Sequence, residues 1–329
     1  MARRPTQKDV AVRAGVSCAT VSYIINNRVG GNIRICAETR QRVLDAVREL
    51  NYLPDVAAQG LSQQKTWLLG VALPDLTKAF YAQVFRGIQR AAAEAGYDLI
   101  VAEVSPVAGD LNAASERMLR RKVDGAIVPA QGLAEETISR LRDAGVKVVV
   151  LGAGGKTEGV CQVVWDEEEG VRQMIAHLLS HGHRKVAFAG GAEKDEETRR
   201  IRQAFLNSLR ELGQTALAGM LSEEDLAAHL EALFQGAEKP TAVFCANGAL
   251  AMKVIWRLEA LGCRVPGDVA VAGFGSCGET APALTTFDPD PTAVGKAAAT
   301  CLVEWLKEGA DDTARSIHVG GRLVIGETT

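Results

Sequence analysis

The chain contains 329 residues, of which 47% are hydrophobic and 23% are charged, and its net charge is −3. These values are typical of a soluble globular protein with two or three domains, and no segment reaches the ~20 apolar residues of a membrane span. The polar residues after residues 1–5 argue against a secretory signal, and seven cysteines without C-x-x-C spacing indicate reduced thiols, so we expect a cytoplasmic protein without a metal site.

The charge is unevenly distributed along the chain. Residues 1–60 contain nine Lys and Arg against five Asp and Glu, which is a net charge of +4. The remaining residues contain 28 Lys and Arg against 35 Asp and Glu, which is a net charge of −7. A basic head on an acidic body is expected if only the head contacts the phosphates of a nucleic acid.

Two short helices joined by a tight turn are predicted within residues 6–27. Thr6 and Asp9 have the spacing of a capping box, Gly15 permits a tight turn, and Ser17 is placed to cap the second helix. The inner faces carry apolar residues at helical spacing, namely Val10, Ala11, Ala14, Val21, Ile24 and Ile25. The pattern indicates a helix-turn-helix, whose second helix enters the DNA major groove, with an ordinary helical hairpin as the alternative.

A third helix is predicted over residues 37–51, after a loop at residues 26–35. Cys36 occupies its N-cap position, and because a thiol is a poor acceptor we expect a weak cap. Pro54 ends this helix, and the segment that follows, up to residue 66, is either a hinge helix or a flexible linker.

Strands and helices alternate from Trp67 to the end of the chain. Strands are predicted at residues 68–74, 97–104, 125–130, 147–152, 185–191, 241–247 and 269–275 and near 317–325. Helices are predicted at residues 81–96, 110–122, 134–144, 167–181, 198–212, 223–235, 249–261 and 291–308. The alternation predicts parallel sheets covered by helices on both faces, and the number of strands favours two doubly wound lobes.

Residues 6–26 also match a longer pattern, T-x-x-D-V-A-x-x-A-G-V-S-x-x-T-V-S-x-x-x-N. With this match the window resembles the DNA-binding headpiece of the LacI/GalR family of bacterial transcription regulators. Later segments resemble the effector-binding core of the same family, which is itself similar to periplasmic sugar-binding proteins. These segments are V-D-G at 123–125, G-H-R-K-V at 182–186, P-T-A-V-F at 240–244 and L-T-T at 284–286.

The resemblance implies an α/β protein with an N-terminal helix-turn-helix headpiece and a two-lobed, doubly wound parallel-sheet core. The implied parts are a DNA-binding domain over residues 1–53, a hinge helix and linker over 54–66, and an effector-binding and dimerisation core over 67–329. Lobe 1 is expected at about 67–163 and 290–322, and lobe 2 at about 164–289 and 323–329. In such folds ligands bind at the carboxyl ends of the strands, in the cleft between the lobes.

The DNA-binding residues implied by the resemblance are Thr6, Ser17, Cys18, Ala19, Thr20, Ser22, Tyr23, Asn26, Ala58, Gln59 and Leu61. Tyr23 replaces an Arg that is common at a base-reading position, so the preferred operator should differ from that of Arg-bearing relatives. Leu61 takes the place of a wedge that enters the minor groove. Gln59 instead of the common Arg, followed by Gly60, indicates a hinge that orders less readily.

The effector-binding residues implied by the resemblance are Phe80, Tyr81, Arg200, Asn247 and Phe274. Phe80 and Tyr81 take the place of an aromatic side chain that stacks on the ligand, with core packing as the alternative. Arg200 lies one residue out of register with the family arginine, because Ile201 takes the aligned place.

Glycines stand at positions that usually carry a charged side chain in the family. Gly152, Gly248 and Gly275 replace acids, and Gly326 replaces an arginine. Because carboxylates are strong acceptors for sugar hydroxyls, an ordinary neutral monosaccharide is disfavoured. Two hypotheses follow: the effector is a larger or anionic sugar derivative that lies near residues 199–202, or sensing is weak or lost.

Other chemistry is not indicated by the sequence. The chain has no recognisable nucleophile–base pair, metal-ligand spacing or phosphate loop, so we expect neither an enzyme nor a cofactor. His177, His181 and His183 are not expected to bind a metal, and residues 166–169 are expected to form a solvated acidic helix start. The sequence therefore predicts a dimeric repressor that binds a pseudo-palindromic operator and responds to a small molecule. The alternative is a soluble sugar-like-molecule binding protein with a vestigial headpiece.

Overall fold

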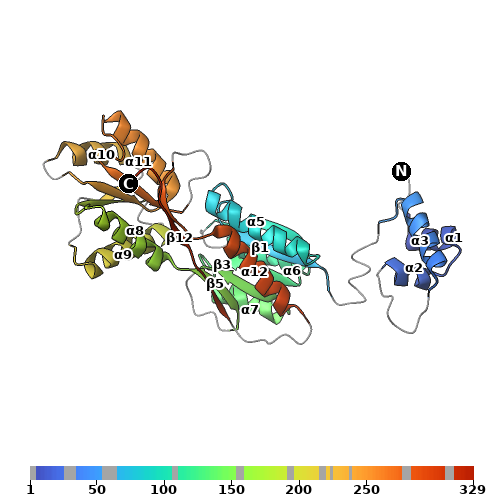
Figure 1. Cartoon of the computed structure of the whole chain (residues 1–329). Coiled ribbons are helices and arrows are strands. Elements are labelled where there is room, and N and C mark those ends of the chain that lie inside the picture. The colour runs from blue at the N-terminus through green and yellow to red at the C-terminus, as the bar shows by residue number, and fades with distance from the viewer. Residues whose placement is uncertain are drawn as a thin grey trace. The chain divides into compact units, whose positions relative to one another are not determined.

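The computed structural model describes residues 5–25, 35–53, 65–105, 110–152, 159–190, 196–214, 220–222, 225–236, 239–275, 283–307 and 315–329. The chain divides into two compact units, Met1–Thr66 and Trp67–Thr329 (Figure 1). Within the described ranges, no helix combines the length and the apolar character that crossing a membrane requires.

The described part of the first unit consists of three helices, α1 (Gln7–Ala14), α2 (Cys18–Ile25) and α3 (Ala37–Glu49). They enclose a small core made of Val10, Ala11, Ala14, Val21, Ile24, Val43 and Ala46. The predicted capping box is confirmed, since the backbone N of Thr6 donates to Oδ2 of Asp9 at 2.7 Å and the backbone N of Asp9 donates to Oγ1 of Thr6 at 3.4 Å. Cys36 lies at the N-cap of α3 and makes no side-chain capping bond to the described backbone.

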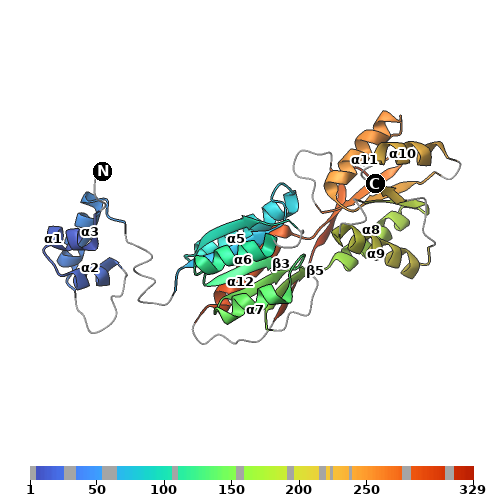
Figure 2. The ribbon, with the colours of Figure 1, turned by 180° about the vertical axis from the view of Figure 1, so that it is seen from behind.

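Lobe 1 of the second unit is built on a parallel sheet, which has six described strands in the order β11-β5-β4-β3-β1-β2. The strands are β1 (Leu68–Leu73), β2 (Asp98–Glu103), β3 (Gly125–Pro129), β4 (Lys147–Leu151), β5 (Cys161–Trp165) and β11 (Ser316–Val319). Helices α5 (Ala79–Glu94) and α12 (Pro291–Trp305) cover one face (Figure 1). Helices α6 (Asp110–Arg120) and α7 (Glu135–Asp143) cover the other face (Figure 2).

Lobe 2 repeats this architecture with six described strands in the order β12-β10-β9-β8-β6-β7. The strands are β6 (Val186–Gly190), β7 (Met220–Ser222), β8 (Ala242–Cys245), β9 (Ala270–Phe274), β10 (Thr285–Asp288) and β12 (Arg322–Val324), and β12 alone among them pairs antiparallel. Helices α8 (Glu167–Ser180) and α9 (Glu196–Glu211) pack on one face. Helices α10 (Leu226–Gln235) and α11 (Gly248–Ala260) pack on the other. The predicted fold class is confirmed.

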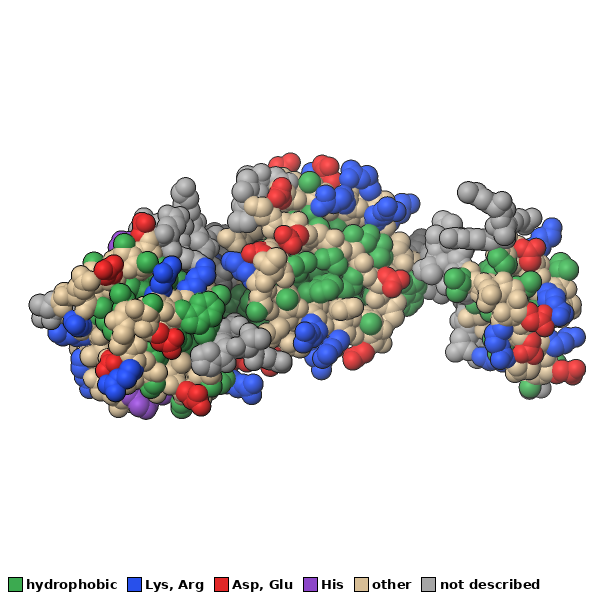
Figure 3. All heavy atoms as spheres, turned by 90° about the horizontal axis from the view of Figure 1, so that it is seen from above, with side chains coloured by type: hydrophobic (Ala, Val, Ile, Leu, Met, Phe, Trp, Pro, Cys, Tyr) green, Lys and Arg blue, Asp and Glu red, His purple; other side chains and the backbone are tan. Residues whose placement is uncertain are grey.

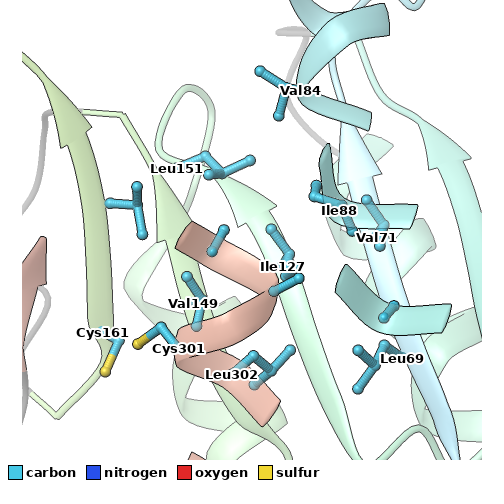
Figure 4. Packing of buried hydrophobic residues seen from close by; sticks show 14 of the residues in the cluster. Leu69, Val71, Val84, Ile88, Ile127, Val149, Leu151, Cys161, Cys301 and Leu302 are labelled. Atoms are coloured by element: carbon cyan, nitrogen blue, oxygen red, sulfur yellow. The ribbon is translucent and has the colours of Figure 1, made fainter. Parts of the chain in front are cut away.

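The core of lobe 1 follows from the alternation of side chains along its strands. In β1, Leu69, Val71 and Leu73 join the cluster beneath α5 and α12, whereas Ala72 joins the cluster beneath α6 and α7. Figure 4 shows Ile88 of α5 and Leu302 of α12 among the side chains that rise from the sheet. A strand with both faces covered is therefore apolar throughout, as the continuous apolar runs in the sequence indicated.

Helices α5 and α12 approach each other without intervening side chains. A Cβ atom added at Gly87 would lie 2.2 Å from the carbonyl oxygen of Thr292, and one added at Gly295 would lie 1.9 Å from that of Val84. Neither distance is possible for a real Cβ atom, so glycine is required at both positions if the backbones are to stay this close.

The predicted strand near residues 317–325 is wrong. The structure has two strands there, β11 in lobe 1 and β12 in lobe 2, because the chain passes between the lobes at Gly320 and Gly321. A Cβ atom at Gly321 would lie 2.5 Å from the ring of Phe287, so the backbone itself packs on that ring. The chain also passes between the lobes after Trp165 and after Asp288.

Candidate functional site

The first candidate site is α2, whose position is held by hydrogen bonds at its start. The backbone N of Thr20 donates to Oγ of Ser17 at 3.1 Å, which is the predicted cap. Nε2 of Gln7, the first residue of α1, donates to the carbonyl oxygen of Cys18 at 3.0 Å. Gly15 adopts the left-handed conformation, with φ of 66°, and its N–H bonds back to α1. The turn between the two helices is thus fixed on both sides.

The outer face of α2 is uncharged. Val21 and Ile24 are buried against α1 and α3, while Cys18, Ala19 and Tyr23 are exposed, Tyr23 to 36%. The helix sequence, CATVSYII, contains no Lys, Arg, Asp or Glu. This face can therefore offer methyl, thiol and hydroxyl groups to a ligand, and no ionic contact.

The remaining predicted DNA-binding residues divide into two groups. Thr6, Ser17, Thr20 and Ser22 are all at least partly exposed, and the first three belong to the capping hydrogen bonds of α1 and α2. The other predicted positions, Asn26, Ala58, Gln59 and Leu61, lie outside the described residues.

The second candidate site is a pocket at the carboxyl ends of the lobe 1 strands. Its described lining consists of Leu73, Phe80, Tyr81, Val84, Pro129, Ala130, Gln131, Leu151, Gly152, Trp165, Arg200 and Val294. Leu73, Leu151 and Trp165 end β1, β4 and β5, which is where the ligands of doubly wound sheets bind. Arg200 alone among these residues comes from lobe 2. The cavity volume is about 30 Å³, which is room for about two water molecules.

Aromatic rings form one wall of this pocket. The centroid of the Phe80 ring lies 5.2 Å from that of Tyr81 in an edge-on geometry and 5.0 Å from that of Trp165. Phe80 and Tyr81 thus lie where an aromatic side chain was expected, and Trp165 joins them from β5. At Gly152 the φ of 97° favours glycine, whereas space does not, because a Cβ atom there would lie at an ordinary contact distance of 3.6 Å from the Trp165 ring.

Arg200 reaches the pocket as one half of an ion pair. Its Nε lies 2.9 Å from Oε2 of Glu167, and its Nη2 lies 3.2 Å from Oε1, so the pair is bidentate. The Glu167 side chain is only 14% exposed and that of Arg200 is 35% exposed. The expectation of a solvated acidic stretch is therefore wrong for Glu167, although Asp166 does cap α8 by accepting from the backbone N of Glu169 at 3.0 Å. Ile201, the residue favoured by the register, is buried in the lobe 2 core.

Two predicted effector residues lie elsewhere. Asn247 caps α11, with its Oδ1 accepting from the backbone N of Leu250 at 2.8 Å. Phe274 is 7% exposed and stacks on Phe287 with ring centroids 5.6 Å apart. Neither is among the described residues that line the pocket. At Gly326 a Cβ atom would lie 1.9 Å from the carbonyl oxygen of Ala283, so no arginine fits there without a backbone shift.

The three histidines of lobe 2 form a separate cluster. The rings of His177 and His181 have centroids 4.3 Å apart, and Nε2 of His177 lies 2.9 Å from Oγ1 of Thr329. Burial, with smaller effects of His181 and His183, lowers the pKa of His177. In the part of the chain that is described, no group of three or more His, Cys, Asp or Glu side chains is arranged to hold a metal ion.

Comparison with known proteins identifies the family of the chain. Residues 6–55 match the model of the bacterial regulatory proteins of the lacI family, and residues 175–329 match that of the periplasmic binding protein-like domain. The HTH-type transcriptional repressor PurR of Vibrio vulnificus is 31% identical over 335 residues, covering 98% of each chain. The chain belongs to the LacI family. Catabolite control protein A of Priestia megaterium is 29% identical to this LacI-family chain, over 93% of it and 94% of the relative.

Solved structures agree at the level of the fold. The lac repressor dimer bound to operator and the anti-inducer ONPF superposes with a TM-score of 0.84 at 24% identity, covering 99% of both chains. The complex of the transcriptional regulator CelR with cellobiose gives a TM-score of 0.69 at 26% identity, covering 99% of this chain and 100% of that one. The family models and the repressor relatives show that the LacI-family chain is a DNA-binding transcriptional regulator with an effector-binding core.

Proposed function

We propose that this LacI-family regulator is a repressor that binds a pseudo-palindromic operator as a homodimer. The observation that carries the proposal is the exposed, uncharged face of α2, held on a capped helix-turn-helix in the same chain as a pocket lined by both lobes. A helix-turn-helix dimer with two-fold symmetry reads two half-sites of opposite orientation, which is why the operator should be palindromic.

The base-reading residues of this proposal are Cys18, Ala19 and Tyr23. Ala19 can give methyl contact to thymine, and Tyr23 offers one hydroxyl and an apolar ring, whereas the bidentate arginine contact to guanine is lacking in this helix. Thr6, Ser17, Thr20 and Ser22 would position the helix on the phosphates. Asn26, Ala58, Gln59 and Leu61 remain proposed contacts on the strength of the family resemblance.

The proposed effector is a small molecule larger than a monosaccharide or anionic. The aromatic wall of Phe80, Tyr81 and Trp165 suits an apolar face of the ligand, and Arg200 suits an anionic group. A cavity of about 30 Å³ does not admit a hexose, so binding requires the lobes to move apart or the aromatic rings to turn. Operator affinity would then change by the ligand's differential affinity for the two states.

Selection of random duplex DNA by the purified full-length protein tests the proposal. One enriched palindrome, bound far more tightly than random DNA and with an affinity that falls steeply with salt, is the expected result. A protein that enriches no sequence but binds small molecules would contradict it and would support a binding protein with a vestigial headpiece.

Calorimetry with glucose and with glucose 6-phosphate tests the effector class. We expect no heat from glucose, because the described pocket lining has no carboxylate to accept its hydroxyl hydrogen bonds. Tight binding of glucose would contradict both the larger or anionic effector and the loss of sensing.

A further inference from the structure

A cluster of four exposed cations lies where α6 ends. Arg117, Arg120, Arg121 and Lys122 follow one another within six residues, and we call them the basic turn. The side chain of Arg120 is 69% exposed. Residues 61–329 carry a net charge of −7, so this concentration of positive charge contrasts with the rest of the core. Figure 3 shows several groups of Lys and Arg side chains on the surface of the core, with Asp and Glu side chains beside them.

The basic turn lies beside the point where the chain enters the second unit. Lys122, with φ of 53°, turns the chain from α6 toward β3. Two residues later, the carboxylate of Asp124 accepts a hydrogen bond from the backbone N of Trp67 at 2.8 Å, and the backbone N of Asp124 donates to the carbonyl oxygen of Leu68 at 2.8 Å. The basic turn therefore lies near the amino ends of β1 and β3, at the edge of the sheet opposite the carboxyl ends that line the pocket.

The favourable effect of cations on a helix C-terminus does not account for the whole cluster. One or two positive side chains in the last turn are enough to interact with the helix dipole. Glu116 offers one carboxylate, which lies 3.9 Å from Arg120 and 3.3 Å from Arg140 and so is shared between two helices. The three arginines of the basic turn still outnumber Glu116 by two, so this exposed edge keeps an excess of positive charge.

We propose that the basic turn binds the phosphates of DNA that flanks the operator. The inference rests on the proposed function, since it requires operator DNA to be held by the first unit. Leu53 and Lys65 are 12 residues apart in the sequence, so the chain between them can span at most about 43 Å and limits how far operator DNA held by the first unit can lie from this edge. Duplex DNA carries about one charge per 1.7 Å, and exposed arginines that neutralise phosphates release counterions whatever the sequence.

The test compares two duplexes that contain the same selected operator, one of 20 and one of 50 base pairs. The variant combines Arg117→Gln, Arg120→Gln and Arg121→Gln, because glutamine keeps the helix propensity of arginine while removing its charge. The matched control combines Arg210→Gln, Lys239→Gln and Arg257→Gln, which removes the same charge from exposed positions in lobe 2. Affinities are measured for the full-length proteins at several salt concentrations.

For the natural protein and the control, we expect tighter binding of the 50-base-pair duplex and a steeper salt dependence. Compared with the 20-base-pair duplex, the slope of log K against log salt for the 50-base-pair duplex should be steeper by about 2 if one arginine of each protomer of a dimer contacts a phosphate. It should be steeper by about 5 if all three arginines of each protomer do so. In the variant the ratio of the affinity for the 50-base-pair duplex to that for the 20-base-pair duplex should fall at least several-fold, while the affinity for the 20-base-pair duplex stays the same.

Three results would overturn the inference. The variant and the control could lose the gain from the flanks equally, the natural protein could bind both duplexes alike, or the variant could lose affinity for the short duplex instead. All of these presuppose that an operator has been selected, whereas failure to select any operator would overturn the proposed function itself. The two failures are therefore distinguishable.

Discussion

Replacing Gly295 by alanine should wedge α5 and α12 apart. The new Cβ atom would lie 1.9 Å from the carbonyl oxygen of Val84 and 3.0 Å from the backbone N of Ile88, so backbone rather than a flexible side chain opposes it. Separation to the 3.0 Å that real Cβ atoms respect requires the helices to move by at least about 1 Å. Overpacking of this kind costs about 1–3 kcal/mol or more, and alanine returns about 1 kcal/mol of helix propensity.

Because rigid backbone opposes the new atom, the upper end of this cost, about 3 kcal/mol, applies. After the gain of about 1 kcal/mol, we expect Gly295→Ala to lower the free energy of unfolding by about 2 kcal/mol. Urea unfolding followed by circular dichroism measures it, with Lys296→Ala as the control, because Lys296 is exposed in the same helix and should change stability by less than about 0.5 kcal/mol. Since α5 also carries Phe80 at its start, the fluorescence of Trp165 should shift as well. A Gly295→Ala protein as stable as the natural one would refute the close backbone contact.

Four further predictions concern the two sites and the histidine cluster. Tyr23→Arg should move the selected operator toward guanine at the contacted position, with a discrimination of about 10- to 100-fold measured by repeating the DNA selection. Glu167→Gln should lower the unfolding free energy by about 1 kcal/mol in urea, because the pair is partly exposed, and should raise the calorimetric affinity for glucose 6-phosphate relative to the natural protein. Thr6→Ala should cost the first unit about 1 kcal/mol of stability in thermal unfolding, because it removes the capping box. The pKa of His177 is lowered in the folded state, so the contribution of this side chain to stability is complete above pH 6.5 and is lost as the pH falls below 6.5. The urea concentration at the midpoint of unfolding should therefore decrease as the pH is lowered from 6.5, and this decrease should be smaller in His177→Gln.

The first unit could be predicted well from the sequence because its signals are local. The capping box of Thr6 and Asp9 and the left-handed Gly15 each act within one turn of helix, and the structure confirms both. The long apolar strands of the core were equally clear. Three short strands, β5, β7 and β10, were not predicted, because strands of three to five residues gain their stability from neighbours distant in the chain rather than from their own pattern.

The pocket could be predicted only in part, because its lining is assembled from distant segments. Phe80 and Tyr81 were found through the family motif, but Trp165 and Gln131 were not. Trp165 is the last residue of β5 and Gln131 follows the end of β3, and the sequence does not reveal where these strands lie in the sheet. An aromatic residue directly before an acidic helix start was the one available signal for Trp165. Glu167 and Arg200 form a partly buried ion pair across 33 residues of sequence. The local sequence around either residue reveals neither its burial nor its partner.

Strand β1 joins the two ends of lobe 1 on which function would depend. Leu73 at its carboxyl end lines the pocket, and Leu68 at its amino end adjoins the residue where the chain arrives from the DNA-binding unit. Six residues of strand form a stiff rod of about 17 Å between these points. If a ligand tilts this rod by about 5° around its pocket end, the other end swings by about 1.5 Å. Strand β1 can therefore transmit a small rearrangement around a bound ligand to its amino end, where it would displace the residue at which the linker joins the second unit.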